Sequence, residues 1–376
     1  MKRAIVVGAG VAGPVVACWL KRIGWEVEVV EARATAAPDE GAFLGLAPNG
    51  VHVLRALGLA EAIGEIGHAC AAFRFFDRHG KVLGEFDRRD DTRAFGAPLT
   101  MVRRGELHLA LVREAERRGV PLRFGDAVRS VDALRGEVEL VSGTRLVGDL
   151  VIGCDGAGSR LREALGGSAL RPSGLFDYGG FAQVDGLPFE PGVQAMVFGR
   201  RAFFGAFTDP TGLTWWFHNG PRDLKDGGAA RLVALHAEDP PWVRALVSAT
   251  PKVLGPWRLW RSLETPRWSH ERVVLIGDAA HAMPPSAGQG ASLALEDAMA
   301  LARSLRDHEV LPDALRAYEA ARRPRVRDIG RVADRNGSGK APSTAVGAWI
   351  RDRVLERVLP AGEAAQSASY AHREPW

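Results

Sequence analysis

The sequence predicts an α/β fold built on parallel strands, joined to a second region that is rich in strands. Three short β-branched runs, at residues 4–7, 150–152 and 273–276, each end at a glycine or an aspartate and lead into a loop or a helix. Between the last two runs the sequence changes from Ala-, Leu- and Arg-rich helix to aromatic, strand-like segments. A chain of 376 residues with 46% hydrophobic residues is long enough for two such domains.

The first run leads directly into GAGVAG, which places Gly8, Gly10 and Gly13 at the spacing G-x-G-x-x-G before a helical stretch. In such a turn the first glycine allows the tight bend, the second lets the backbone approach a pyrophosphate, and the third allows close helix–strand packing. A second strand, EVEVVEA, carries Glu31, whose carboxylate can accept a hydrogen bond from a ribose 2′-hydroxyl. The pattern predicts a dinucleotide site for NAD or FAD, and the acid disfavours the 2′-phosphate of NADP.

Two later segments repeat the strand-to-loop transition. DLVIGCDGAGSRLR contains Asp155 and Gly156 after a buried strand, and ERVVLIGDAAHAMPP contains Gly277 and Asp278. Each aspartate is also compatible with a plain turn or helix N-cap. Their occurrence after a dinucleotide fingerprint favours a shared ligand site.

Together these motifs resemble those of the single-component FAD-dependent aromatic hydroxylases, the para-hydroxybenzoate hydroxylase family of flavoprotein monooxygenases. The resemblance extends over nearly the whole chain. Its motifs are the glycine fingerprint with Glu31, R-x-x-L at Arg104 and Leu107, D-G-x-x-S-x-x-R from Asp155 to Arg162, and G-D-A-A-H, P-x-x-G-Q-G and D-A from Gly277 to Ala298.

The resemblance implies how the chain holds FAD. Asp278 is expected to bind the ribityl chain, and Gly288 and Gly290 to leave room for the isoalloxazine ring. The helix that follows would aim its positive end at that ring. Arg104 is expected near the ribityl-phosphate region, although Arg103 could exchange roles with it. The residues predicted to contact FAD are Gly8, Gly10, Ala12, Gly13, Glu31, Arg33, Gly45, Arg104, Asp155, Asp278, Pro285, Gly288 and Gly290.

The implied fold is a glutathione-reductase-type, Rossmann-like FAD domain with an inserted mixed β-sheet substrate domain and a C-terminal helix. We expect residues 1–72, 100–172 and 268–335 to form the discontinuous FAD domain, and residues 73–99 and 173–267 the substrate domain. Residues 336–376 are expected to form a linker-like stretch after Gly337, a closing helix packed on the FAD domain, and a frayed tail after Pro360.

The segment RAFFGAFTDPTGLTWWFHNG predicts a hairpin that turns at residues 209–212. Alternation places Leu213, Trp215 and Phe217 on one face and Thr214, Trp216 and His218 on the other. Substrate-pocket candidates are Phe207, Trp215 and Trp216, and packing within the domain is the alternative for each.

The candidates for a direct catalytic role are His281, His218 and Pro285, and none is compelling as a base. Arg200 and Arg201 could meet a substrate carboxylate. Cys18, Cys70 and Cys154 lack metal-ligand spacing, so no metal site is expected. The absence of a nucleophile–base set fits chemistry that is supplied by a cofactor.

The resemblance implies a reaction in which NADH or NADPH, bound transiently, reduces FAD. O2 then forms a flavin C4a-hydroperoxide that hydroxylates a small aromatic or phenolic substrate. A flavin-dependent alkene reductase of the geranylgeranyl-reductase type and a non-catalytic FAD-binding partner protein are the alternatives. A flavin halogenase is disfavoured because the W-x-W-x-I-P stretch is absent.

The composition adds limits on partners and location. A net charge of +4 and interleaved acids along the Arg-rich segment at residues 318–337 do not imply nucleic acid. No run reaches the roughly 18 apolar residues of a membrane span. We expect a cytoplasmic protein, either a monomer or a homodimer that does not use a thioredoxin-like C-terminal domain.

Overall fold

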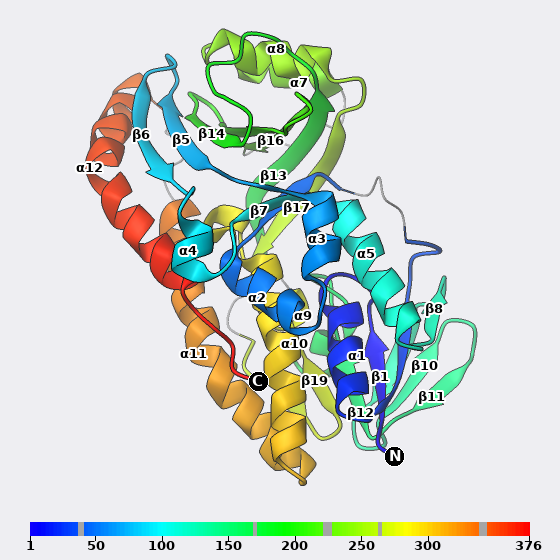
Figure 1. Ribbon diagram of the computed structural model, residues 1–376. Coiled ribbons are helices and arrows are strands. Elements are labelled where there is room, and N and C mark those ends of the chain that lie inside the picture. Colours follow the sequence, from blue (N-terminus) through cyan, green and yellow to red (C-terminus); the bar gives the residue numbers. More distant parts are fainter. Residues whose placement is uncertain (37–40, 168–170, 221–227, 262–264, 338–343) are drawn as a thin grey trace.

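The computed structural model describes residues 1–36, 41–167, 171–220, 228–261, 265–337 and 344–376. Figure 1 shows a lower body of helices around a parallel sheet and an upper layer formed by a second, larger sheet. The predicted α/β class is confirmed, and the placement of each domain boundary stays a prediction.

A six-stranded sheet forms the centre of the lower body. Its order is β18-β19-β12-β1-β2-β8, with β18 antiparallel and the remaining strands parallel. Ala4 to Val7 are buried, as expected for a strand covered on both faces. The strands are β1 (Arg3–Val7), β2 (Glu26–Glu31), β8 (Leu122–Phe124), β12 (Leu150–Gly153), β18 (Ser269–His270) and β19 (Val273–Leu275).

Helices pack around this sheet and against one another. Helix α1 contacts both α10 and α5, and α10 contacts α2 and α11. These helices are α1 (Ala12–Arg22), α2 (Pro48–Ala56), α3 (Ala60–Ile66), α5 (Arg104–Arg117), α6 (Arg160–Ala164), α9 (Asp278–His281), the 3-10 helix η1 (Pro285–Ala287), α10 (Gly290–Asp307) and α11 (Leu311–Gly337).

Two small sheets complete the lower body. One is the meander β9 (Val128–Asp132), β10 (Glu137–Leu140) and β11 (Arg145–Val147). In the other, β7 (Thr100–Arg103) lies between β3 (Phe43–Leu46) and β4 (Gly67–Ala69), antiparallel to both. This second small sheet lies below the upper layer in Figure 1.

The upper layer is a seven-stranded sheet in the order β17-β13-β16-β15-β14-β5-β6. Helices α7 and α8 cover one face, and the other face points toward the lower body (Figure 1). The predicted hairpin is present as β15 and β16. The elements are β5 (Ala72–Asp77), β6 (Val82–Asp87), α4 (Asp91–Phe95), β13 (Arg171–Ala182), β14 (Val193–Phe198), β15 (Phe203–Thr208), β16 (Thr214–Gly220), α7 (Gly228–Leu235), α8 (Pro241–Ala249) and β17 (Leu254–Arg261).

The C-terminal region differs from the expectation. Residues 338–343 of the expected linker lie outside the described residues. Helix α12 (Ala345–Tyr370) continues through Pro360 and contacts β6 and α2. The prediction of a frayed tail is wrong, because buried Glu374 pairs with Arg322 at 3.0 Å and the Trp376 ring lies 4.2 Å from that of Trp19. These partners are far away along the sequence, so no local pattern reveals them.

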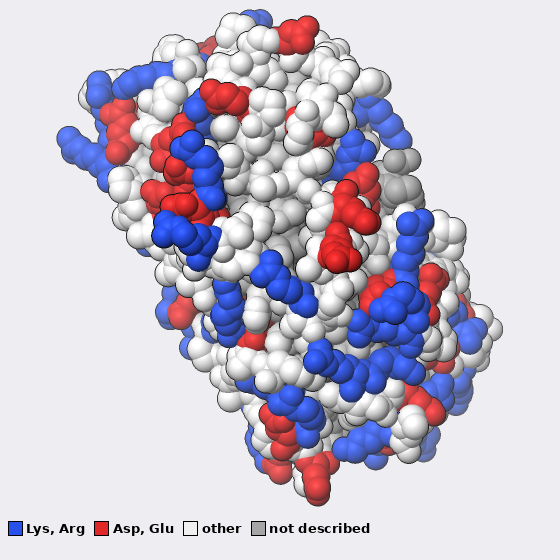
Figure 2. Space-filling view, in the orientation of Figure 1, with Lys and Arg blue, Asp and Glu red and all other residues white. Residues whose placement is uncertain are grey.

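The surface shown in Figure 2 carries intermingled positive and negative side chains. Within the described part of the chain, no helix combines the length and apolarity needed to cross a membrane.

Candidate active site

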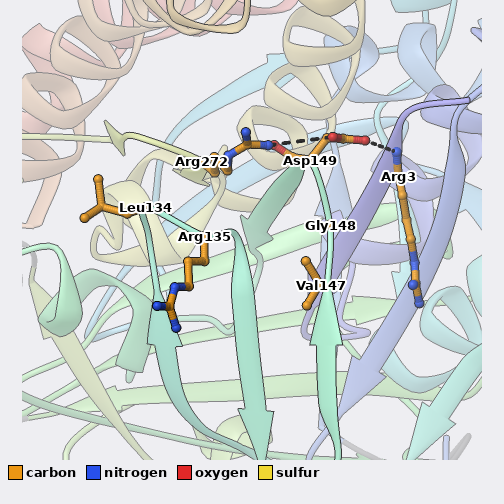
Figure 3. Close-up of a pocket in the computed structure, with 7 residues that line it drawn as sticks. All are labelled: Arg3, Leu134, Arg135, Val147, Gly148, Asp149 and Arg272. Atoms are coloured by element: carbon orange, nitrogen blue, oxygen red, sulfur yellow. Dashed lines mark hydrogen bonds and ion pairs between the residues drawn. The ribbon is translucent and has the colours of Figure 1, made fainter.

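Three motif-bearing strands end side by side. Strands β1, β12 and β19 are parallel neighbours, so the segments beginning at Gly8, Asp155 and Gly277 follow the same edge of the sheet. The carboxyl edge is where open α/β sheets bind ligands. A surface pocket of about 340 Å³, lined by Arg3, Asp149 and neighbours, lies instead at the amino ends of β1 and β12 (Figure 3). Its Asp149 carboxylate is already engaged by Arg272 and by the N–H of Arg3.

The fingerprint glycines divide into two that pack tightly and one that faces open space. Gly8 has φ of +103°, and a Cβ there would lie 2.4 Å from the carbonyl oxygen of Cys154. A Cβ on Gly13 would lie 1.9 Å from the carbonyl oxygen of Gly8, whereas a Cβ on Gly10 would meet no atom within 4 Å. No described side chain caps the N-terminus of α1. This free helix end beside Gly10 is suited to a pyrophosphate.

The Glu31 carboxylate stabilises the glycine turn from the neighbouring strand. It accepts hydrogen bonds from the N–H of Ala9 at 2.7 Å and from the N–H and Nε of Arg33 at 2.9 and 3.0 Å. Burial alone would raise the pKa of Glu31, but these hydrogen bonds outweigh burial and lower it. Glu31 is therefore ionised and can accept a further hydrogen bond from a ribose hydroxyl. Ala12, at the start of α1, packs beside Gly277.

The Asp155 carboxylate caps helix α6 with one oxygen and leaves the other oxygen without a described partner. Its Oδ2 accepts from the N–H groups of Arg160 and Leu161, at 2.9 and 3.3 Å, while Oδ1 is buried and has no partner among the described residues. Burial raises the pKa of this carboxyl despite those bonds. Arg162 then donates to the carbonyl oxygen of Ala279 at 3.1 Å, which ties the second motif to the third.

The third motif is held by what we call the Asp297 clasp, formed by Gly277, His281, Asp297 and Arg322. Asp297 Oδ2 accepts from the N–H of Gly277 at 2.9 Å and bonds His281 Nε2 at 2.6 Å, and Oδ1 accepts from Arg322 Nε at 2.7 Å. Burial alone would raise the pKa of Asp297, but His281 and Arg322 lower it to about 2. His281 is buried within the clasp, so the geometry favours a positioning role over that of a base.

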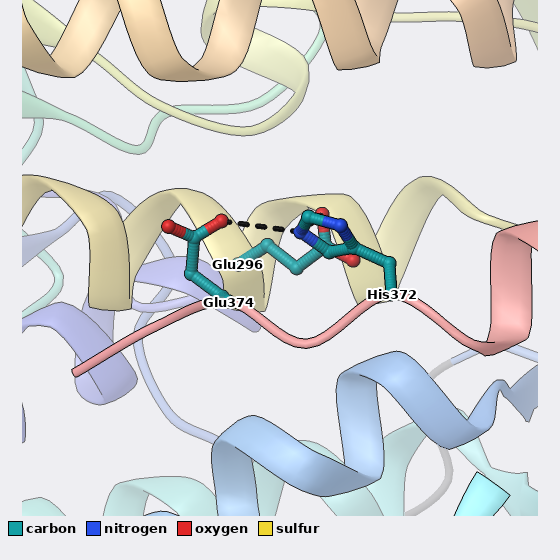
Figure 4. Close-up of side chains that lie close together, drawn as sticks. All are labelled: Glu296, His372 and Glu374. Carbon is teal, nitrogen blue, oxygen red and sulfur yellow. Dashed lines mark hydrogen bonds and ion pairs between the residues drawn. The ribbon is translucent and has the colours of Figure 1, made fainter.

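The C-terminal tail completes the surroundings of the clasp. His372 and Glu374 approach Glu296 of α10, as Figure 4 shows. These residue types can bind metal ions, but Arg322 lies 2.7 Å from Glu296 and 3.0 Å from Glu374. Arg325 is a further partner of Glu296, at 2.7 Å. The arginines thus supply the positive charge that these carboxylates need, and the cluster fastens the tail to the helix that follows the third motif.

Four predicted FAD contacts in the third motif and the loop before α10 are exposed or face open space. Asp278 and Pro285 are exposed, and Cβ atoms on Gly288 or Gly290 would meet nothing within 4 Å. Gly288 has φ of +61°, which favours glycine. Gln289, at the N-cap of α10, is buried, and its Nε2 has no acceptor among the described residues.

Two further predicted contacts lie on the small sheet that contains β3 and at the start of α5. Gly45 lies on β3, where Leu99 and Met101 side chains pack within 3.4 Å of a Cβ placed there. Arg104 is exposed at the start of α5 and packs beside Gly41. Its neighbour Arg103 points elsewhere: its guanidinium lies over the rings of Phe181 and Trp215, 4.9 and 5.6 Å from their centroids.

The substrate candidates separate onto two sides of the upper sheet. Phe207 and Trp215 pack together on the face toward the lower body, with ring centroids 5.5 Å apart. Trp216 lies on the helix-covered face and donates to Thr250 of the α8 region at 2.7 Å. Trp216 therefore cannot line the same surface as Trp215, because neighbouring residues in a strand point to opposite faces.

His218 also lies on the helix-covered side. It is fully buried, bonds His236 at 2.8 Å, and His236 in turn bonds Asp239 at 2.6 Å. Burial lowers the pKa of His218 well below its ordinary range. A role as catalytic base is not supported, since the ring faces the core between the sheet and α7. Arg201, a carboxylate candidate, pairs with Glu238 near the same side.

Sequence reasoning placed Trp215 and Phe217 on one side of the strand but missed the other two members of what we call the aromatic face, formed by Phe43, Phe181, Trp215 and Phe217. Phe43 lies 5.7 Å from Trp215 and 6.0 Å from Phe217, and Phe181 lies 6.2 Å from Trp215. Trp215 is buried, and the other three rings are half-buried. The face joins β3 of the lower body to β13 and β16 of the upper sheet. Alternation within β13 could have indicated Phe181, but the approach of β3 could not be foreseen.

Comparison with known proteins decides the family. The model of the family described as "FAD binding domain" matches residues 2–185 and 244–333. The chain belongs to the FAD-dependent aromatic hydroxylases.

Curated hydroxylases resemble the chain over most of its length. It is 31% identical to 6-hydroxynicotinate 3-monooxygenase of Pseudomonas fluorescens, over 89% of this chain and 91% of that protein. It is 33% identical to 3-amino-4-hydroxybenzoate 2-monooxygenase PtmB3 of Streptomyces platensis, over 89% and 87%. The solved structure of Klebsiella pneumoniae HpxO complexed with FAD and uric acid aligns with a TM-score of 0.87 and 25% identity, over 98% of this chain and 96% of that one.

The residues of this hydroxylase fit FAD. Gly10, Gly288 and Gly290 leave open the space that side chains would fill, and two helix N-termini, those of α1 and α10, carry no described side-chain cap. Buried polar atoms of Asp155 and Gln289 keep hydrogen-bonding capacity at the same edge of the sheet. The individual FAD contacts remain predictions.

Proposed function

We propose that this hydroxylase uses FAD, O2 and NADH or NADPH to hydroxylate an aromatic small molecule. The observation that carries the proposal is the convergence of three motif-bearing strand ends at one edge of the parallel sheet, in a chain that also has a half-buried aromatic face between β3 and the upper sheet. FAD-dependent hydroxylation of aromatic compounds is the activity of the family. Which aromatic compound the protein hydroxylates is the more specific part of the proposal.

When bound, FAD would take up reducing equivalents from the nicotinamide cofactor and activate O2. The turn at Gly8–Gly13 and the N-terminus of α1 would hold the pyrophosphate, and Glu31 a ribose. Asp278 would bind the ribityl chain. The N-terminus of α10 would stabilise negative charge on the reduced ring, because its free N–H groups carry the positive end of the helix dipole.

The aromatic face would hold the substrate ring and keep water away from the reacting atoms. Oxygen transfer needs a dry site, because water would promote unproductive loss of the activated oxygen before it reaches the substrate. The relatives named above act on a hydroxylated pyridine carboxylate and an aminohydroxybenzoate, which supports a ring that already carries an electron-donating hydroxyl or amino group. Phe207 packs edge-on against the Trp215 ring of this face.

The location and assembly are further parts of the proposal. Cys18, Cys70 and Cys154 are buried free thiols, which supports a reducing compartment such as the cytoplasm. We propose a monomer or a homodimer, with a small-molecule substrate and no nucleic-acid partner.

The test measures NADH and NADPH oxidation and O2 uptake by the purified holoprotein with a panel of phenols, hydroxypyridines and aminophenols. We expect at least one compound to accelerate flavin reduction and to give a hydroxylated product. Flavin reduction with reduced alkene product and no O2 consumption would support the alkene-reductase alternative. A protein that binds FAD but is never reduced by either nicotinamide cofactor would support the non-catalytic alternative.

A further inference from the structure

His108 places a buried imidazole against the glycine turn. It lies on α5, four residues after Arg104, and directly follows Leu107, the last residue of the R-x-x-L motif. Only 5% of the residue is exposed, and its Nε2 is 2.6 Å from the carbonyl oxygen of Ala9, the residue before Gly10. A carbonyl oxygen can only accept a hydrogen bond, so Nε2 carries the proton and donates it.

The backbone of Ala9 is held from two sides. Its N–H donates to Glu31 Oε2 at 2.7 Å, and its carbonyl oxygen accepts from His108. Ala9 is completely buried, so water cannot readily replace either partner. Because a buried carbonyl oxygen without a donor is costly, the imidazole and the carboxylate together keep this part of the turn in one arrangement.

Holding this carbonyl group also fixes the direction of the next N–H. The peptide bond between Ala9 and Gly10 is trans and planar, so its C=O and its N–H point in opposite directions. The carbonyl oxygen points to His108, and the N–H of Gly10 therefore points away from that ring. None of the described residues accepts a hydrogen bond from this N–H, and a Cβ on Gly10 would meet no atom within 4 Å. The N–H is thus an available donor where the pyrophosphate is expected.

We propose that His108 is a positioning residue for FAD, which holds the Ala9 carbonyl oxygen so that the N–H of Gly10 faces the pyrophosphate. The ring acts through the backbone and does not itself touch the cofactor. Without the Nε2 donor, the peptide between Ala9 and Gly10 can rotate and turn its carbonyl oxygen toward the phosphates, whose negative charge repels it. The inference rests on the placement of the pyrophosphate in the proposed function and adds the residue that orients its donor.

The test measures cofactor affinity and folding separately. The whole chain, freed of FAD, is titrated with FAD while flavin fluorescence reports binding, and urea denaturation gives the free energy of unfolding. His108→Leu removes the donor and keeps an apolar side chain, so the dissociation constant for FAD should rise about tenfold. His108→Gln carries an amide N–H that can reach the same carbonyl oxygen, so it should restore most of the affinity.

A destabilised control separates positioning from a general loss of stability. Leu246→Ala leaves a cavity in the separate core between the upper sheet and α8. This variant should lower the free energy of unfolding and leave the affinity for FAD unchanged. An equal loss of FAD affinity in Leu246→Ala and in His108→Leu would overturn the inference, because it would make the loss a consequence of destabilisation alone.

A double variant tests whether His108 acts through Gly10. Gly10→Ala places a methyl group where the pyrophosphate is expected and should weaken FAD binding by itself. If His108 acts by orienting the N–H of Gly10, the double variant of Gly10→Ala and His108→Leu should bind FAD little more weakly than Gly10→Ala alone. Full additivity of the two losses would overturn the inference, as would unchanged FAD affinity in His108→Leu or equal losses in His108→Leu and His108→Gln.

Failure of this inference and failure of the hydroxylase proposal give different results. Unchanged FAD affinity in His108→Leu, together with aromatic-dependent O2 consumption by the unmodified protein, would remove the positioning role and keep the hydroxylase. The absence of any aromatic-dependent O2 consumption would remove the proposed function itself, whatever the FAD titrations show.

Discussion

The Asp297 clasp and the aromatic face differ in how fully their charged groups are paired. In the clasp, a buried carboxylate has both oxygens occupied, by Gly277, His281 and Arg322. On the aromatic face, the charge of Arg103 has a single weak and exposed described partner. Full pairing of the clasp carboxylate fixes the start of the third motif in place, while the half-buried rings and the partly exposed guanidinium of the aromatic face keep surface open to a ligand.

The largest effect is expected from breaking the clasp at Arg322. Arg322→Leu leaves Asp297 and Glu296 buried without this cation, so the free energy of unfolding should fall by about 3–5 kcal/mol and FAD should be lost. Urea denaturation and the flavin content of the purified protein measure this. Arg316→Leu, on the exposed side of the same helix, is the control and should change stability by less than about 0.5 kcal/mol. Equal free energies of unfolding for Arg322→Leu and Arg316→Leu would contradict the stabilising role of the clasp.

The pH dependence tests the charge state of the clasp. The pKa of Asp297 is about 2 in the folded chain, below its ordinary value of 3.8. A group with a lowered pKa stabilises the fold above the ordinary value, and that contribution disappears as the pH falls through the folded value. We therefore expect unmodified protein to lose about 2 kcal/mol more stability than Asp297→Asn between about pH 4 and pH 2. Parallel curves from denaturation at each pH would show that Asp297 does not titrate as described.

Alanine substitutions at Gly10 and Gly13 distinguish an effect on FAD binding from an effect on folding. Gly10→Ala adds a methyl group in open space, so the free energy of unfolding should change by less than about 1 kcal/mol. The same methyl group would occupy space expected for the pyrophosphate, so FAD affinity should fall at least about tenfold. Gly13→Ala should destabilise the fold itself, because its Cβ would collide with the carbonyl oxygen of Gly8. Flavin fluorescence titration and thermal denaturation distinguish the two outcomes. Unchanged FAD affinity in Gly10→Ala would place the pyrophosphate elsewhere.

The smallest effect on stability is expected on the aromatic face. Phe181→Leu trims a half-buried ring, so the unfolding free energy should change by about 1 kcal/mol or less while aromatic ligands bind severalfold more weakly. Trp216→Phe, on the helix-covered side, should destabilise the fold and leave ligand affinity unchanged, since its Nε1 donates to Thr250. Calorimetry and spectral titration check the pair. If Phe181→Leu destabilises the fold and Trp216→Phe weakens ligand binding, the two faces of the sheet have the opposite roles.

The sequence predicted features that depend on local spacing. The glycine turn, the two later strand ends and the alternation of Trp215 and Trp216 all follow from neighbouring residues. The clasp was not predicted, because Asp297 meets Arg322 and Arg322 meets Glu374 across 25 and 52 residues. His218 was a candidate because its chemistry is versatile, and only the packing of α7 against the sheet revealed that its ring is enclosed.

The central claim is that this hydroxylase transfers one oxygen atom from O2 to an aromatic ring. The most direct measurement is turnover under ¹⁸O2 with NADH or NADPH and the aromatic compound that most accelerates flavin reduction, followed by mass spectrometry of the product. The account predicts a hydroxylated product that carries one ¹⁸O atom. Consumption of NADH and NADPH that yields only hydrogen peroxide with every aromatic compound, or a product without ¹⁸O, would contradict it.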